Sequence, residues 1–262
     1  MKPFLIIFGQ TVSSYRLFAV LAVIFGVITL SLLLYRNKIG IYKVIALIIP
    51  LLVFFFTGAR LFNLFLNPKA YETVSVFKLE FVGLSIFGGF IGAVFAVILW
   101  CKIFHIPVWR ILDLCIIPAA GSFAIARVGC FLNGCCSGKF FNSIFAVVYP
   151  RFINSTGLES YPVLPTQLFE LILALVVLIP ALIVFKKKKV FPNGSAFLIY
   201  ASLFCAMRLI ILPLRRLPYE PWIKLYFYPA FYIILIITLL AIFSIRYYMK
   251  VKGKAENNEM KS

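Results

Sequence analysis

The sequence predicts an all-α membrane protein with about seven transmembrane helices and a small external lobe. Apolar residue types make up 63% of the 262 residues, and the mean hydropathy is +1.05. A soluble domain is about half apolar, so a soluble core could not bury this excess. Lipid must therefore surround much of the chain.

Seven apolar stretches are long enough to cross a bilayer as helices. The fourth is interrupted by Asp113, Pro118 and Arg127, and the others are almost free of charge. The predicted spans are 17–35, 44–65, 82–100, 111–128, 168–185, 196–214 and 226–245. Together they define a membrane domain over residues 1–249.

Two stretches do not have the composition of spans. Residues 140–165 are long and polar in places, so we expect a small extramembrane lobe with strand character over 144–149. Residues 250–262 are charged, and we expect a disordered cytoplasmic tail.

The formal net charge of +18 is carried by 26 Lys and Arg residues against 8 acids. These charges lie mostly between apolar runs, which favours a role in membrane topology and headgroup contact over nucleic-acid binding. If the N-terminus is outside, 14 basic residues fall on the inner side and 8 on the outer side, with four at or inside span ends. Inner loops carry the excess of Lys and Arg. The densest group is the lysine run 186–189, so we expect an outer N-terminus and a cytoplasmic C-terminus.

Three arginines fall near the outer ends of spans. Arg60 ends the second span, Arg127 ends the fourth, and Arg208 lies in the outer half of the sixth. Tyr15 and Arg16 begin the first span at the same level. Few acids are available to neutralise these arginines, and guanidinium groups bind phosphate through forked hydrogen bonds. We therefore expect an anionic headgroup site, with snorkelling of each arginine to the interface as the alternative.

Four motifs resemble prolipoprotein diacylglyceryl transferases. They are Gly58-Ala59-Arg60-Leu61, the glycine-rich stretch 83–92, the stretch 127–134 that begins Arg127-Val128-Gly129, and the stretch 165–170 that ends in Glu170. Their order and spacing match that family over nearly the whole chain. The glycines of the third and fourth spans also indicate close helix packing.

The resemblance implies that diacylglyceryl is moved from phosphatidylglycerol to the lipobox cysteine thiol of preprolipoproteins at the bacterial cytoplasmic membrane, with the site facing outward. It implies catalytic roles for Arg127 and Arg208. The implied substrate-binding residues are Tyr15, Arg60, Arg127, Asn133, Gly138, Arg208 and Arg215. We expect no cofactor, no metal ion and no nucleic-acid partner; the partners are phosphatidylglycerol, lipobox peptides and membrane lipid.

This chain departs from the family's pattern at its acid and base positions. Phe87 and Leu164 stand where the family commonly has histidine, Cys130 and Cys135 replace an Asn and a Glu, and Leu212 replaces a Glu. The sole histidine, His105, falls in an inner loop. A divergent relative that binds an anionic phospholipid or a membrane peptide without catalysis is therefore the alternative function.

The six cysteines fall into two groups. Cys101, Cys115 and Cys205 lie in or at the ends of spans, where small apolar side chains pack. Cys130, Cys135 and Cys136 cluster at the outer end of the fourth span. For this cluster the sequence leaves open helix packing, a disulfide, and a thiolate activated by Arg127. A metal site would need more ligands, and no histidine is near in the sequence.

Overall fold

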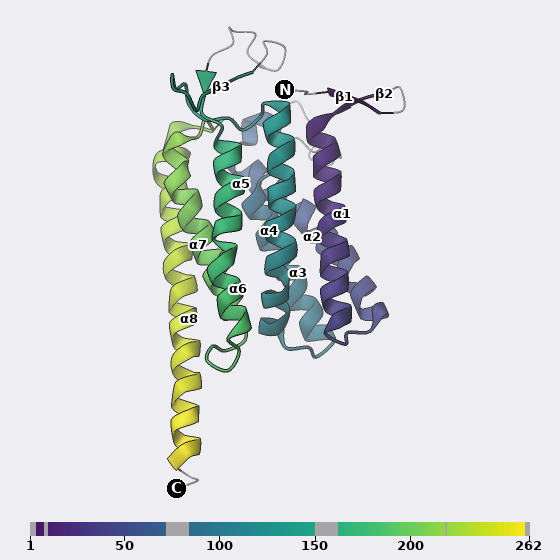
Figure 1. Ribbon diagram of the computed structural model, residues 1–262, viewed down its shortest axis with the longest axis vertical. Coiled ribbons are helices and arrows are strands. Elements are labelled where there is room, and N and C mark those ends of the chain that lie inside the picture. The colour runs from purple at the N-terminus through teal and green to yellow at the C-terminus, as the bar shows by residue number, and fades with distance from the viewer. Residues whose placement is uncertain (1–3, 8–9, 72–83, 150–161, 218, 260–262) are drawn as a thin grey trace.

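The computed structural model is a bundle of long helices with a small β-hairpin and a loop-rich lobe at one end (Figure 1). It describes residues 4–7, 10–71, 84–149, 162–217 and 219–259. The long helices are α1 (Ser14–Arg36), α2 (Ile41–Leu66), α3 (Ile86–Ile103), α4 (Val108–Asn133), α5 (Thr166–Val176), α6 (Leu178–Lys186), α7 (Ser195–Ile211) and α8 (Tyr228–Glu259).

Seven helical segments of the described chain are long and apolar enough to span a membrane, with α5 and α6 counted as one. This confirms the predicted multi-pass membrane protein. Apolar side chains point outward along α1 at every fourth position, at Ile24, Ile28 and Leu32, which are about half exposed. Such a stripe is unfavourable in water and is expected for a helix that contacts lipid.

Glycines bring α2 and α3 into close backbone contact. A Cβ on Gly88 would collide with the carbonyl oxygen of Gly58, and a Cβ on Gly92 would collide with the carbonyl oxygen of Phe54. The predicted glycine packing of the third span is confirmed at these positions. Gly83, and the predicted start of this span at residue 82, lie outside the described residues; the helix is seen from Ile86.

The fourth span is one continuous helix, and one of its polar interruptions, Asp113, has a structural role. Pro118 lies inside the helix. The buried Asp113 carboxylate accepts hydrogen bonds from the backbone N–H groups of Gly194 (2.6 Å) and Phe197 (2.9 Å). It therefore caps the N-terminus of α7, whose first N–H groups have no partner within the helix.

The fifth span is divided at Val177 into α5 and α6, which the sequence analysis did not predict. Pro180 explains the division. Proline has no backbone N–H and its ring crowds the carbonyl four residues earlier, so the helical hydrogen bond to Val176 is not made.

Residues 134–149 and 162–165 form the described part of the lobe. Its strands β3 (Val147–Val148) and β4 (Pro162–Val163) pair antiparallel. The predicted strand character over 144–149 is thus confirmed for two residues, whereas residues 150–161 lie outside the described chain. A second hairpin, of β1 (Phe4–Ile7) and β2 (Gln10–Ser13), precedes α1 and was not predicted.

The prediction of a disordered tail from residue 250 is wrong for residues 250–259, because α8 continues through Glu259. Side chains of α8 form hydrogen bonds with backbone carbonyl groups of the connection between α6 and α7. Lys250 Nζ donates hydrogen bonds to the carbonyl oxygens of Lys188 (2.8 Å) and Phe191 (2.7 Å). Arg246 Nη2 donates to the carbonyl oxygen of Asn193 (2.9 Å).

The bundle has two different ends (Figure 1). The hairpin, the lobe and the end of α4 lie at one end, which we call the lobe end. The lysine run 186–189 and the C-terminus lie at the other. His105, with a backbone φ of 52°, precedes α4. At a helical rise of 1.5 Å per residue, His105 lies about 30 Å along the bundle from Arg127. Its imidazole is therefore too far from the lobe end to contact Arg127.

Candidate functional site

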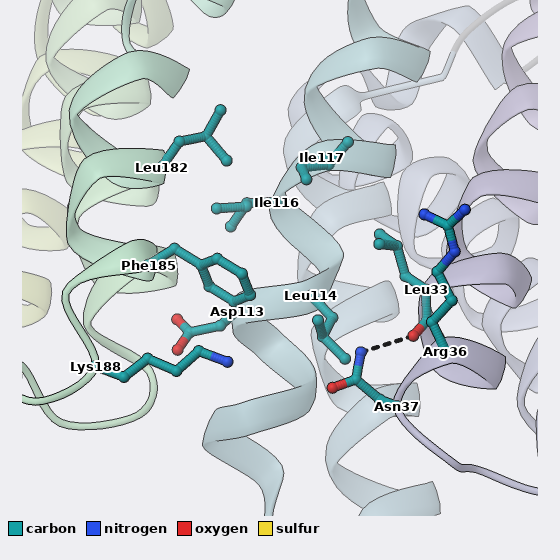
Figure 2. A pocket seen from close by; sticks show the side chains of 10 residues that line it. All are labelled: Leu33, Arg36, Asn37, Asp113, Leu114, Ile116, Ile117, Leu182, Phe185 and Lys188. Carbon is teal, nitrogen blue, oxygen red and sulfur yellow. Dashed lines mark hydrogen bonds between the residues drawn. The ribbon is translucent and has the colours of Figure 1, made fainter.

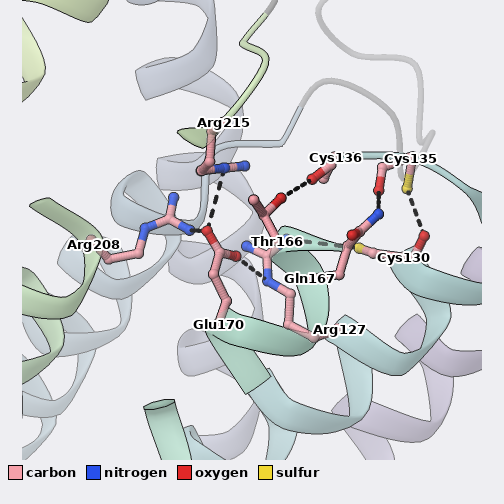
Figure 3. A network of polar contacts seen from close by, with 9 residues as sticks. All are labelled: Arg127, Cys130, Cys135, Cys136, Thr166, Gln167, Glu170, Arg208 and Arg215. Carbon is pink, nitrogen blue, oxygen red and sulfur yellow. Dashed lines mark hydrogen bonds and ion pairs between the residues drawn. The ribbon is translucent and has the colours of Figure 1, made fainter. Parts of the chain in front are cut away.

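A buried carboxylate with three arginines around it lies at the lobe end (Figure 3). The Glu170 side chain is 1% exposed and forms three ion pairs. Its Oε2 lies 2.8 Å from Arg127 Nε. Its Oε1 lies 2.5 Å from Arg208 Nη1 and 3.3 Å from Arg215 Nε. All three arginines are buried. We call these four residues the arginine cluster.

Three regions that are far apart in sequence supply the cluster: α4, α5, and α7 with the turn that follows it. Arg127 lies two turns before the end of α4, Glu170 lies in the second turn of α5, and Arg208 lies near the end of α7. Arg215 follows the 3₁₀ turn η3 (Leu212–Leu214), which contains Pro213. Proline disfavours continuation of α7, so the chain turns and directs Arg215 back to Glu170.

Gly138 sets the position of Arg215. The two residues form an antiparallel bridge, the Gly138 N–H donates to the Leu164 carbonyl (2.8 Å), and the Lys139 N–H donates to the Leu214 carbonyl (2.8 Å). A Cβ at Gly138 would lie 2.8 Å from Leu164 Cβ, Leu214 O and Thr166 Cγ2. Only glycine allows these three segments to approach so closely.

The arginine cluster carries more positive than negative charge. Three guanidinium groups face one carboxylate, so two positive charges remain in a buried place, where an uncompensated charge is costly. Burial, followed by repulsion from Arg208, lowers the pKa of Arg215 from its ordinary value. The Nε of Arg208 is buried and has no hydrogen-bond partner within the described part of the chain. An anion with acceptor oxygens would neutralise the excess positive charge and accept a hydrogen bond from Arg208 Nε.

Aromatic rings hold two of the guanidinium groups. Arg127 lies over the ring of Phe123 at 4.8 Å, and Arg208 lies over the ring of Phe87 at 5.4 Å. Phe87, at a position where the family that the sequence resembles commonly has histidine, is thus a neighbour of Arg208. A phenyl ring attracts a cation but has no proton to exchange.

The loop after α4 is bound to the start of α5. Thr166 Oγ1 donates to the Cys136 carbonyl at 3.0 Å, and Gln167 Nε2 donates to the Cys135 carbonyl at 2.8 Å. Gln167 Nε2 also lies 3.2 Å from the hydroxyl of Tyr149, whose pKa burial raises to about 12. The loop that begins at Gly134 is therefore fixed next to the arginine cluster.

Three thiols lie on the other side of Arg127. The sulfurs of Cys130, Cys135 and Cys136 are within 4.8 Å of one another, and none is in a disulfide. Arg127 Nη1 contacts Cys130 Sγ at 3.9 Å, and Cys135 Sγ donates to the Cys130 carbonyl at 3.8 Å. Hydrogen bonds from the Cys130 and Cys135 thiols hold the pKa of Cys136 well below its ordinary value, and Arg127 adds to this effect.

The structure places the predicted site residues in three groups. Arg127, Arg208 and Arg215 come together. Asn133 lies next to α1, where its Oδ1 accepts a hydrogen bond from Ser13 Oγ (3.1 Å), and Tyr15 lies within electrostatic range of the thiols. Arg60 lies apart from Glu170, over the ring of Tyr71 at 5.2 Å.

Glu170 is the site residue that sequence reasoning did not include among the functional positions. A carboxylate in an otherwise apolar span was the available signal, because such residues are rare in membranes and nearly always paired. Its pairing with three arginines from three other segments depends on the tertiary fold.

Two cavities lie away from the centre of the arginine cluster. One, of about 200 Å³, is at the opposite end of the bundle (Figure 2). Its lining is mostly apolar, and its polar members are Arg36, Asn37, Asp113 and Lys188. The second, of about 230 Å³, lies beside Arg215 and is lined by Leu212, Pro213 and Pro229 among other apolar residues, with Lys139 and Lys224. The second cavity thus combines apolar walls with two cations.

Comparison with known proteins identifies similar chains. Residues 3–250 match the sequence profile of the family described as prolipoprotein diacylglyceryl transferase. A protein of Dehalococcoides mccartyi named phosphatidylglycerol–prolipoprotein diacylglyceryl transferase is 38% identical over 148 residues, 56% of this chain and 52% of that protein. Proteins with the same name from Clostridium tetani and Rhodopirellula baltica are 31% and 32% identical, over 52% and 50% of this chain and 53% and 28% of their own lengths. The matched region thus spans about half the length of the first of these relatives.

Proposed function

This chain belongs to the prolipoprotein diacylglyceryl transferase family, and from that premise we propose that it transfers diacylglyceryl from phosphatidylglycerol to the thiol of a lipobox cysteine. The relatives named above carry this activity in their names. The observation that supports it most in this chain is the arginine cluster, with two excess positive charges and an unpartnered Arg208 Nε. A phosphodiester supplies both the charge and the oxygens that this cluster lacks.

The reaction makes a definite demand on the site. The lipobox thiolate attacks the glyceryl carbon that is bonded to the phosphate oxygen, a C–S bond forms, and the C–O bond breaks. Glycerol phosphate leaves with the electron pair, and the proton of the thiol ends on the phosphate. Negative charge grows on the leaving phosphate in the transition state, so Arg127 and Arg208 have catalytic roles because they stabilise that charge.

The thiolate needs no dedicated base in this proposal. Phe87 and Leu164 are buried apolar side chains and accept no proton. A free thiol has a pKa of about 8.5, so a few per cent is thiolate at pH 7. The positive field of the arginine cluster raises that fraction for a substrate thiol that reaches it.

The remaining predicted residues have supporting roles in the proposal. Gly138 positions Arg215 beside the phosphate, and Asn133 and Tyr15 face the peptide from the other side of Arg127. Arg60 is buried over the ring of Tyr71 and adds to the positive charge that favours an anionic lipid. The cavity lined by Lys139 and Lys224 accepts the lipid from the membrane, since it combines apolar walls with two cations.

We further propose that the lobe end faces the outside of the bacterial cytoplasmic membrane. The lysine run 186–189 lies at the opposite end of the bundle (Figure 1), and cytoplasmic loops carry the excess of Lys and Arg. Preprolipoproteins then present the lipobox cysteine to the arginine cluster from the outer leaflet.

A lipid-binding relative without catalysis is the second candidate. The apolar character of Phe87, Leu164 and Leu212, all buried, favours it, because these positions in the family carry groups that exchange protons. Such a protein would keep the arginine cluster and bind phosphatidylglycerol, and would leave the thiol unmodified.

Complementation separates the two candidates. The gene would be expressed in a bacterial strain depleted of its own transferase, and lipidation of a reporter lipoprotein would be followed by its mobility on a gel. We expect lipidation with the unchanged chain and none with Arg208→Ala at equal membrane abundance. Phosphatidylglycerol binding without any lipidation would favour the non-catalytic relative.

A further inference from the structure

Three thiols that the transfer reaction does not use lie together beside the arginine cluster. Cys130 is in the last turn of α4, and Cys135 and Cys136 follow in the loop. The chain reverses through Gly134 (φ 76°) and Cys136 (φ 61°). This reversal brings the three sulfurs within 4.8 Å of one another, which the spacing of five and six residues does not by itself require.

The sequence predicted no metal ion, but this arrangement fits a metal ion better than it fits a disulfide. Adjacent cysteines such as Cys135 and Cys136 do not bridge without strain. A disulfide from Cys130 to either would leave the third thiol unused. Three sulfurs around one ion lie about 4 Å apart when each metal–sulfur bond is about 2.3 Å, so the present separation needs only small adjustments.

The surrounding charge also fits. Three thiolates with Zn²⁺ carry a net charge of −1, and with Cu⁺ a net charge of −2. Either complex would lie next to Arg127, which contacts Cys130 Sγ and belongs to a cluster with two excess positive charges. The positive charge of the arginine cluster therefore stabilises an anionic metal–thiolate complex. It would repel a metal ion held by neutral ligands, because that complex would keep its positive charge.

We propose that Cys130, Cys135 and Cys136 bind one thiophilic d¹⁰ metal ion, Zn²⁺ or Cu⁺, as three thiolates. Binding releases the three thiol protons to solvent and changes no oxidation state. For Zn²⁺ a fourth position stays open on the side of the exposed Cys136. The bound ion would link the end of α4 to the loop that carries Gly138. This proposal does not depend on the transferase activity.

The test uses the full chain, purified in detergent under reducing conditions and stripped with a chelator. Zinc is then added, and bound metal is measured by elemental analysis after removal of the excess. In a parallel sample, alkylation of Cys136 is followed by mass spectrometry with and without zinc. We expect one zinc per chain and clearly slower alkylation of Cys136 when zinc is present, because the same thiolate is the metal ligand and the nucleophile.

Two variants provide the comparison. Cys136→Ser alters an exposed side chain and should reduce zinc affinity at least about tenfold. Cys115→Ala lies on the same helix outside the thiol cluster and should bind as the unchanged chain does. No zinc on the reduced protein, or equal affinity in Cys136→Ser and the unchanged chain, would overturn the proposal. So would alkylation of Cys136 at the same rate with and without the metal.

Discussion

At the scale of single residues, the proposed phosphate binding rests on the charge imbalance around Glu170. Arg127, Arg208 and Arg215 compete for one carboxylate, and Arg208 keeps a buried N–H group without a partner in the described chain. A protein that needed only internal neutrality would not require three cations here. The surplus is explained if a phosphate completes the cluster.

Loss of either strongly paired arginine should weaken lipid binding. Arg127→Ala and Arg208→Ala each remove a charged hydrogen bond worth about 1.5–3 kcal/mol, so affinity for phosphatidylglycerol should fall roughly ten- to hundredfold. Arg→Lys should restore only part of it, because Lys lacks the planar fork. The measurement is lipid binding in nanodiscs. Exposed Arg216 supplies the control, and Arg216→Ala should have a much smaller effect; equal small losses at all three positions would indicate snorkelling.

Removal of the Glu170 charge should destabilise the folded protein and increase the stabilisation that bound phosphatidylglycerol provides. Glu170→Gln leaves three buried guanidinium groups without their anion, and breaking a buried pair costs about 3–5 kcal/mol. The melting temperature should fall, and added phosphatidylglycerol should raise it more than in the unchanged chain, because bound ligand stabilises the folded state. Glu220→Gln removes a carboxylate from an exposed position and should lower the melting temperature much less than Glu170→Gln does. An equally stable Glu170→Gln chain would contradict this electrostatic role for Glu170.

At the scale of secondary-structure elements, the loop after α4 joins three segments through Gly138. Gly138→Ala places a Cβ 2.8 Å from Leu164, Leu214 and Thr166, so the strand segment that positions Arg215 must move. We expect a loss of about 1–3 kcal/mol of stability and weaker lipid binding, both measured on the purified chain. Gly253→Ala is the matched control, because a Cβ there meets nothing within 4 Å. If Gly138→Ala changed neither stability nor lipid binding, the three segments would be able to separate without a cost in free energy.

The elements also show which features were predictable. Apolar runs of bilayer length predicted all seven spans, since hydropathy and length are local properties of the sequence. The division of the fifth span at Val177 follows from Pro180 and could have been predicted. The order of α8 beyond residue 249 could not, because it depends on Lys250 reaching carbonyl groups of the loop between α6 and α7, more than 55 residues away.

The candidate site also has features that local sequence predicts and features that depend on tertiary contacts. Arg127 and Arg208 were predictable because an isolated cation in an apolar span is rarely accidental. Arg215 was carried by the family resemblance, and the structure explains it through Gly138. Glu170 shows the limit: the sequence indicates that it needs a partner, but only the packing of α4, α5 and α7 shows that it has three.

At the scale of the whole molecule, the proposed topology makes the two ends of the bundle chemically distinguishable. In a chain with Cys136→Ser, a cysteine introduced at Ile144, which is 92% exposed in the lobe, should react with a membrane-impermeant thiol reagent in intact spheroplasts. A cysteine at Lys187, in the lysine run, should react only after lysis. The reverse pattern would place the lobe in the cytoplasm and separate the arginine cluster from outer-leaflet substrates.

The most direct test of the central claim is transfer by the purified chain. Labelled phosphatidylglycerol and a lipobox peptide are incubated with the protein in nanodiscs from about pH 6 to 9, and the label on the peptide is counted. We expect transfer that rises with pH toward the substrate thiol's pKa of about 8.5, is lost in Arg208→Ala, and is largely retained in Cys130→Ser. Absence of transfer at every pH, with phosphatidylglycerol still bound, would contradict the assignment of this chain as a transferase.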